Sequence, residues 1–252
     1  MLPRCRTAGE PFAMPTFDVQ VSDVAGFMDE LQTFQSLFHE CFARSEARAH
    51  CLDYMVGQYS PLARKSIEPM ALAVEGGSIR SLPRFLSETV WDEEQMRWHY
   101  HQLVADELGE PEGVLMFDAS GLVKKGKDSA GVARPYCGTL GKVENCQGGV
   151  LAGYASRQGY VLVDQRRFLP EVWCDPADAT RRAKCQVPAE MRLQTKPQLA
   201  AAMLRKIRPE GLRPFRYIVA DSVDGNSPDF LAAIEAWGGA TALVAISSET
   251  RC

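Results

Sequence analysis

The chain has 252 residues, 46% of them hydrophobic, and a formal net charge of −4. A chain of this length and composition can form one large or two small globular domains with a sizeable core. The composition excludes a disordered chain, a collagen-like repeat and a coiled coil. No apolar run approaches the roughly 20 residues that a membrane-spanning helix needs, so we expect no membrane partner.

Residues 1–17 contain basic side chains but no apolar segment of the kind found in signal peptides, and we expect a disordered tail there. The 8 cysteines are dispersed and form no CxxC pair, which indicates a reducing, cytoplasmic location. Cys41, His50 and Cys51 could be considered as zinc ligands. Their spacing matches no standard zinc pattern, so a half-buried helix face is the favoured interpretation.

The net charge conceals a strong asymmetry along the chain. Residues 1–118 hold 9 basic and 19 acidic side chains, residues 119–216 hold 18 basic and 8 acidic, and residues 217–252 hold 1 basic and 5 acidic. A basic segment between acidic flanks indicates a surface that faces a polyanion. The competing interpretation is a solvated surface with chance clustering.

Residues 18–110 read as a helical N-terminal domain. Ser22 can cap a helix whose apolar residues recur at helical spacing as far as Phe42. Ser60 and Pro61 look like the N-cap and first residue of a second helix, which would end at residues 76–77. Asp92 is expected to cap a third helix that ends at Gly109.

From residue 113 the pattern changes to that of an α/β protein, and we assign residues 111–252 to a second domain. The hairpin turn at 156–159 makes its flanking strands antiparallel. The expected order is βββαβαβ, which is that of a ribonuclease-H-like mixed sheet with the first and fourth strands side by side at its centre. The expected strands are 113–118, 148–155, 159–168, 215–221 and 241–246, and the expected helices are 196–207 and 228–237.

Asp118 and Asp221 stand at the ends of those two central strands. Two carboxylates that close repel each other, and a divalent cation with oxygen ligands, Mg²⁺ or Mn²⁺, removes the repulsion. Two such ions about 4 Å apart can activate a water or a 3′-hydroxyl for attack on a phosphodiester. The pair therefore predicts a metal site and catalytic residues for DNA chemistry, with the nearby basic segment holding the DNA backbone.

A rival motif lies in the loop after the first of these strands. Residues 121–127 fit GxxxxGK, the phosphate-binding loop of nucleotide hydrolases. Asp128 stands where a metal-binding Ser or Thr is required, and residues 129–135 are a poor start for a helix. A nucleotide hydrolase is therefore the third-ranked function, and no nucleotide cofactor is expected.

Several separate blocks, in the right order, resemble one group of bacterial insertion-sequence transposases of the DDE class, the seven-hundred-and-one insertion-sequence family. The resemblance runs from about residue 18 to the end of the chain. The blocks that carry it are 117–138, 141–147, Arg167-Phe-Leu-Pro-Glu-Val-Trp173, Thr195-Lys-Pro-Gln-Leu-Ala200 and Val219-Ala-Asp221 with Gly225 after it.

The resemblance implies a ribonuclease-H-like core, Mg²⁺ dependence, cleavage at transposon ends and strand transfer into target DNA at the bacterial nucleoid. Asp118 and Asp221 match the first two acids of the Asp-Asp-Glu triad. The helical domain can then serve packing, homodimer formation or DNA contact. The expected DNA-contacting residues are Lys124, Lys125 and Lys127, with Arg134, Lys142, Arg166 and Arg167 as weaker candidates.

The chain departs from the pattern of this family at two positions near the acids. Relatives often have an acid where this chain has Ala119, and an aromatic residue where it has Asp224. Asp224 precedes Gly225, and a turn-forming role is favoured over a role as a stray metal ligand.

The third acid of the triad, a Glu, should lie on a helix beyond the last strand, but the chain stops at Cys252. Neither Glu235 nor Glu249 is a credible substitute. We therefore expect a truncated core that binds divalent metal weakly and lacks strand transfer, which leaves enzyme activity open. The alternative is a non-catalytic DNA-binding or dimerising fragment that regulates an intact transposase.

Overall fold

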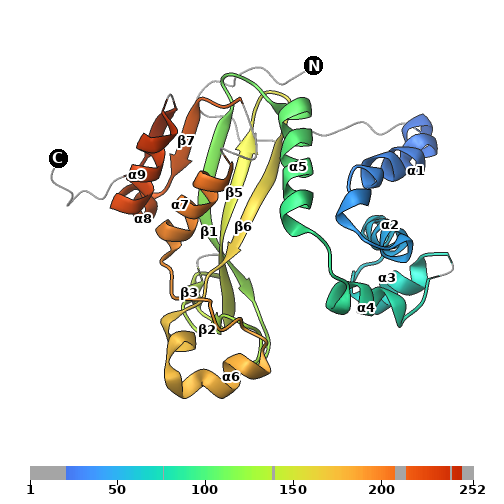
Figure 1. The fold of residues 1–252 in the computed structure, drawn as a ribbon, viewed down its shortest axis with the longest axis horizontal. Helices are drawn as coiled ribbons and strands as arrows, with labels where there is room; N and C mark the ends of the chain where they lie inside the picture. Colours follow the sequence, from blue (N-terminus) through green and yellow to red (C-terminus); the bar gives the residue numbers. More distant parts are fainter. Residues whose placement is uncertain (1–20, 76, 138–139, 208–213, 239, 246–252) are drawn as a thin grey trace. The chain divides into compact units, whose positions relative to one another are not determined.

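The computed structural model describes residues 21–75, 77–137, 140–207, 214–238 and 240–245 (Figure 1). The expected disordered tail at 1–17 and the expected end of the last strand at 246 lie outside the described residues. The chain divides into two compact units between His99 and Tyr100. No helix in the described ranges is long and apolar enough to cross a membrane.

The first unit is built from helices. They are α1 (Val21–Ser36), the short 3₁₀ helix η1 (His39–Cys41), α2 (Ser45–Tyr59), α3 (Ile67–Ala73), α4 (Ser81–Glu88) and the first part of α5 (Glu93–Leu108). Phe42, Phe85 and Trp91 pack together with ring centroids 5.6 to 6.2 Å apart. This aromatic cluster joins the chain after η1 to the segment that enters α5.

Two helix boundaries in this unit differ from the sequence prediction. The first helix ends at Ser36 rather than near Phe42, and Phe42 is buried instead through a bridge to Trp91. Ser60 follows the end of α2 in an extended conformation, so the prediction that it starts a helix is wrong. Asp92 does cap α5, because its Oδ1 accepts a hydrogen bond from the Gln95 N–H at 2.9 Å.

The second unit contains a mixed sheet, as the sequence predicted. Its strands are β1 (Val114–Val123), β2 (Val132–Ala133), β5 (Cys146–Ala155), β6 (Tyr160–Arg167), β7 (Tyr217–Ala220) and β8 (Thr241–Val244). The order is β2-β5-β1-β7-β8, and β6 pairs with β5. β1, β5 and β6 are antiparallel to their neighbours in that group, whereas β1, β7 and β8 run parallel.

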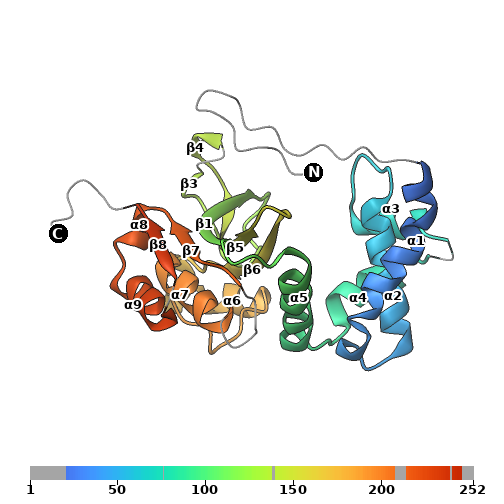
Figure 2. The same ribbon diagram turned by 90° about the horizontal axis from the view of Figure 1, so that it is seen from above.

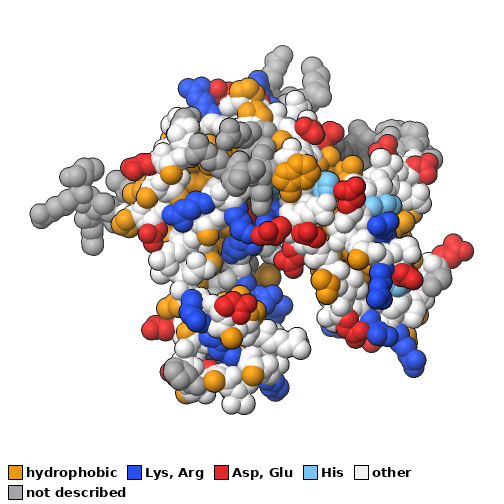
Figure 3. All heavy atoms as spheres, viewed as in Figure 1, with side chains coloured by type: hydrophobic (Ala, Val, Ile, Leu, Met, Phe, Trp, Pro, Cys, Tyr) orange, Lys and Arg blue, Asp and Glu red, His pale blue; other side chains and the backbone are white. Residues whose placement is uncertain are grey.

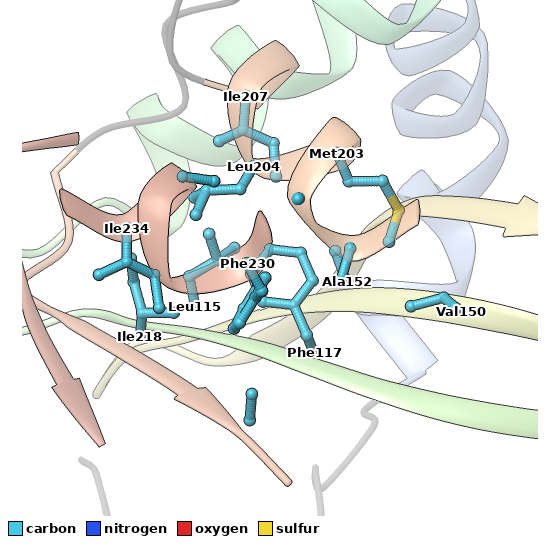
Figure 4. Packing of buried hydrophobic residues seen from close by; sticks show 14 of the residues in the cluster. Leu115, Phe117, Val150, Ala152, Met203, Leu204, Ile207, Ile218, Phe230 and Ile234 are labelled. Atoms are coloured by element: carbon cyan, nitrogen blue, oxygen red, sulfur yellow. The ribbon is translucent and has the colours of Figure 1, made fainter. Parts of the chain in front are cut away.

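Helices lie against one face of this sheet (Figure 2), and that face carries the core of the unit (Figure 4). Residues alternate along β1, so Leu115 and Phe117 are buried while Met116 and Asp118 are exposed on the other face. The helices α7 (Lys196–Ile207) and α9 (Pro228–Trp237) cover the buried face. Figure 4 shows their side chains against the sheet, including Met203, Leu204, Ile207, Phe230 and Ile234.

β1 is longer than the sequence predicted. The expected strand ended at Asp118 with a loop from Gly121, but β1 continues to Val123 because it pairs with β5 as far as Val123 and Cys146. The polar segment after residue 168 is also more ordered than expected. It contains η3 (Glu171–Cys174), η4 (Pro176–Asp178) and α6 (Ala179–Lys184), and a small core of Val132, Leu169 and Trp173 lies beneath them.

Candidate active site

The parallel pairing of β1 with β7 brings Asp118 and Asp221 to neighbouring positions. The last pair of the ladder is Phe117 with Ala220, and each Asp is the next residue of its chain. Neighbouring strands lie about 4.8 Å apart, so the two side chains start from adjacent points of the sheet. Both residues are exposed. The structure therefore brings together the two acids that the sequence singled out.

Backbone amides hold one oxygen of each carboxylate. Asp118 Oδ1 accepts a hydrogen bond from the Ala119 N–H at 2.7 Å. Asp221 Oδ1 accepts hydrogen bonds from the N–H groups of Val223 and Asp224, at 2.9 and 3.2 Å, where the short helix α8 (Ser222–Gly225) begins. Oδ2 of each acid has no hydrogen-bond partner within the described ranges and remains free for another ligand.

Asp224 is a third carboxyl group beside this pair, and sequence reasoning had set it aside. Its side chain is only 4% exposed, and its Oδ1 has no hydrogen-bond partner. Burial, followed by the charges of Asp221 and Asp118, raises its pKa to about 6, and Lys196 opposes the rise. Asp224 does lie in a turn, because its carbonyl accepts a hydrogen bond from the Ser227 N–H at 3.0 Å, although its Oδ1 takes no part in that turn.

Carboxylate oxygens are the ligands that hard divalent cations prefer, so Asp118 and Asp221 are the residues to consider as metal ligands. Two exposed carboxylates with free oxygens face solvent beside a buried carboxyl group that lacks a donor, and this excess of negative charge favours hard cations with oxygen ligands. Within the described ranges, no three His, Cys, Asp or Glu side chains form a group that could hold a metal. Asp118 and Asp221 are therefore the two residues that could ligate such an ion.

Comparison with known proteins places this chain in a family. The family model of the DDE superfamily endonucleases matches residues 37–251. The chain belongs to this family. It is also 29% identical, over 211 residues, to the probable transposase for insertion sequence element IS701 of Microchaete diplosiphon. That alignment covers 83% of this chain and 51% of the relative, so the chain spans about half the length of the protein it matches.

The predicted DNA-contacting lysines lie at the far end of β1. Lys124, Lys125 and Lys127 follow the strand, and Lys124 comes six positions after Asp118, which is roughly 20 Å of extended chain. Asn145 fixes the loop, since its Nδ2 donates to the carbonyls of Lys124 and Gly126 at 2.7 and 2.8 Å. These lysines are therefore placed away from the two acids.

The weaker candidates Arg166 and Arg167 lie closer to the acids. Asp118 pairs with Leu151 across β1 and β5, and Leu151 pairs with Gln165 across β5 and β6. Arg166 and Arg167 follow Gln165, so they lie about two strand spacings, roughly 10 Å, from Asp118. Both arginines line a groove of about 630 Å³ together with Ser120 and Gln147. Arg166 also forms an ion pair with Asp164, at 3.1 Å.

The other basic side chains of this part of the sequence fall into groups according to the partners that they contact. Arg134 is exposed, whereas Lys142 forms an ion pair with Glu144 at 3.2 Å. Arg181 and Arg182 donate to backbone carbonyls, and Lys184 forms an ion pair with Asp128. In Figure 3 the Lys and Arg side chains around α6 lie among acidic ones rather than on one continuous basic face. Part of the basic segment is therefore structural.

The structure contradicts the phosphate-loop alternative. The GxxxxGK motif begins inside β1, at Gly121, and continues into the loop that leads to β2. No helix starts in the described residues 128–137 that directly follow it, so they offer no helix N-terminus to receive a phosphate group. Gly126 has φ +83° and makes the turn that returns the chain toward β2.

Proposed function

We propose that this chain forms part of the DNA transposase of an insertion sequence, which cleaves and transfers DNA strands with the help of Mg²⁺ or Mn²⁺ in the bacterial cytoplasm. The observation that carries the proposal is the pairing of β1 with β7, which puts Asp118 beside Asp221. We also infer that residues 111–252 form a ribonuclease-H-like core and that residues 18–110 form a helical domain before it.

Asp118 and Asp221 would hold the metal through the oxygens that the backbone amides leave free. When bound there, a divalent cation supplies Lewis acidity for attack on a phosphodiester and stabilises the leaving oxygen. The backbone N–H groups of Ala119, Val223 and Asp224 fix the two carboxylates, so their orientation is set before the ion arrives.

The DNA strand would run along the exposed face of the sheet that carries Asp118. Arg166 and Arg167 line the groove on this face, and Lys124, Lys125 and Lys127 extend the positive charge to its far end. Phosphate contacts of this kind hold nucleic acid without reading its sequence. The terminal repeats would therefore be recognised through other contacts.

Two carboxylates bind Mg²⁺ weakly, because this ion needs near-octahedral oxygen coordination and gives up its water reluctantly. We therefore expect the 252-residue chain to bind Mg²⁺ weakly and to lack strand transfer. The test is incubation of the purified chain with Mn²⁺ or Mg²⁺ and labelled DNA from either side of its coding sequence. We expect a gel shift that weakens with salt, and Mn²⁺ retention that Asp118→Asn or Asp221→Asn removes.

The outcomes separate the parts of this proposal. Cleavage that Asp118→Asn abolishes would support the transposase function and contradict the expected inactivity. Mn²⁺ retention that neither Asp118→Asn nor Asp221→Asn reduces would contradict the metal site itself.

The second candidate function is a regulatory fragment that binds DNA or an intact transposase without cutting. The observation in its favour is that the described ranges contain basic side chains for DNA but no group of three metal-ligating residues. A gel shift without nicking, together with inhibition of an intact transposase on the same DNA, would favour this candidate.

Formation of homodimers by the helical domain would be measured by light scattering.

A further inference from the structure

The groove of about 630 Å³ on the exposed face of the sheet comes within one strand of Asp118. Leu151, which pairs with Asp118 across β1 and β5, is one of the residues that line the groove. Successive side chains of a strand point to opposite faces, so alternate rows of the sheet face the groove. Two of these rows form part of its floor, Leu151 with Gln165, and Ser120 with Gly149 and Arg167.

The opposite wall of the groove is the turn that follows α6. The Val187 N–H donates to the Arg182 carbonyl at 3.0 Å, and the Gln186 N–H donates to the Ala183 carbonyl at 3.1 Å. This pair of hydrogen bonds is the Schellman motif that commonly ends a helix. Arg182 Nη2 also donates to the Pro188 carbonyl at 3.0 Å, so the position of this wall is fixed by the fold.

Gln186 occupies the position of this turn that glycine normally takes. Its φ is +53°, and it is the one residue other than glycine with a positive φ in the described ranges. A side chain in this left-handed region costs conformational energy that glycine avoids, and such strain concentrates at functional sites. The Gln186 side chain is exposed and lines the groove, so the cost indicates that this side chain has a use there.

The other side chains of the groove match the chemistry of a nucleotide strand. Arg166 and Arg167 line it, and none of its described lining residues is acidic, although the chain holds 32 acidic residues. This charge complements the phosphates of DNA. Leu122 and Leu162, which are 63% and 60% exposed, offer apolar surface to the faces of bases. A duplex hides these faces, so the combination favours an unpaired strand.

Gln165 and Gln186 place an amide on each side of the groove, one from β6 and one from the turn after α6. Neither side-chain amide has a hydrogen-bond partner within the described ranges, whereas the Gln147 amide donates to the Ala130 carbonyl. A glutamine amide donates and accepts at once, which matches the N7 and N6 atoms of adenine. The two amides are therefore able to select a base that lies between the walls.

We propose that this groove holds an unpaired segment of the DNA strand, in which Gln165 and Gln186 select adenine through hydrogen bonds to the base edge. This inference rests on the proposed function, because it takes DNA as the substrate. It adds a sequence preference to a surface whose arginines contact phosphates.

The test is fluorescence anisotropy of the purified 252-residue chain with two labelled single strands of equal length, one of thymine only and one with adenines at its centre. A bidentate amide contact discriminates between bases by about fivefold or more, so two contacts should favour the adenine strand at least about 20-fold. Gln165→Ala and Gln186→Gly should each reduce this preference about fivefold. The matched control is Gln158→Ala, an exposed amide in the β5–β6 turn, which should leave the preference unchanged.

Two further measurements separate base selection from other roles of these residues. Glycine relieves the left-handed backbone, so Gln186→Gly should have a melting temperature at least as high as that of the wild type. A loss of preference in this variant would then not result from misfolding. Arg167→Gln should weaken both strands equally and lower the slope of log affinity against log salt concentration by about 0.7.

The outcomes distinguish this inference from the proposed function. A wild type without a preference for adenine, or an unchanged preference in both glutamine variants, would overturn the inference alone if duplex DNA is still bound. Dimers that Gln186→Gly dissociates, measured by light scattering, would also overturn it, because the groove would then hold a second copy of the chain. Failure of the wild type to bind either single-stranded or duplex DNA would overturn both.

Discussion

Glu110, which follows α5, forms a hydrogen bond and an ion pair with Arg157 in the turn of the β5–β6 hairpin. Its Oε2 accepts a hydrogen bond from the Arg157 N–H at 2.9 Å, and its Oε1 pairs with the Arg157 guanidinium. Its own N–H donates to the Tyr154 hydroxyl, which in turn donates to the Pro214 carbonyl. One residue thus connects a helix, a hairpin and the segment that enters β7.

This contact makes a prediction about pH. The side-chain and backbone hydrogen bonds from Arg157 hold the pKa of Glu110 below its usual range. A folded-state pKa below the unfolded one adds stability at neutral pH, which is lost as pH falls through about 4 and below. We expect Glu110→Gln to lower the melting temperature at pH 7 and to have a smaller effect at pH 3.

Thermal unfolding of the wild type and Glu110→Gln at both pH values would measure this effect, with Glu235→Gln as the control for an exposed charge. Equal differences at pH 7 and pH 3 would show that the Glu110 contact does not depend on ionisation.

At the scale of elements, the sequence predicted the parts that local patterns determine. The alternation and length of the apolar runs located β5, β6 and β7, and Asp92 marked the start of α5. The length of β1 could not be predicted, because residues 119–123 are held by pairing with β5 rather than by their own β propensity. The helix α2 was missed since its apolar residues form no clear stripe.

The same contrast between local sequence patterns and long-range packing applies to the residues of the candidate site. Asp118 and Asp221 were predictable because each follows an apolar strand segment and the topology makes those strands neighbours. Asp224 was not, because its burial arises from the packing of α8 against α7 and β8, which no local pattern of the sequence reveals. The sequence did contain one indication that Asp224 lies near the site, because it comes only three residues after Asp221 in a short helix.

The loop after β1 depends on one side chain of the segment before β5. Asn145 Nδ2 donates to two of its carbonyls, those of Lys124 and Gly126. Removing the donor leaves both unpaired, and we expect Asn145→Ala to lose about 1–2 kcal/mol of local stability. Amide hydrogen exchange should then quicken in residues 124–131. Gln165→Ala, an exposed amide on β6, serves as the control, and unchanged exchange in the loop would contradict the assigned anchoring role.

At the scale of the whole molecule, the net charge of −4 does not reveal that the basic residues form two groups, those engaged in contacts within the protein and those exposed to solvent. Arg181, Arg182 and Lys184 are engaged with backbone carbonyls or Asp128, so their charge helps to hold the segment around α6 together. Lys125 and Lys127 are exposed and Lys124 is half-buried. The second group should therefore contribute more to DNA binding than the first.

Salt dependence measures that contribution directly. Each phosphate contact adds about 0.9 to the slope of log affinity against log salt concentration, because bound counterions are released. Changing Lys124, Lys125 and Lys127 to Gln should lower this slope by up to about 2.7 and weaken binding to all DNA sequences alike.

The matched control changes three exposed arginines of the first unit, Arg44, Arg64 and Arg80, to Gln, which gives the same change in net charge. If DNA binding depends on the loop after β1, the control keeps the wild-type slope. Equal losses in both triple variants would show that DNA responds to the net charge of the molecule and not to this loop.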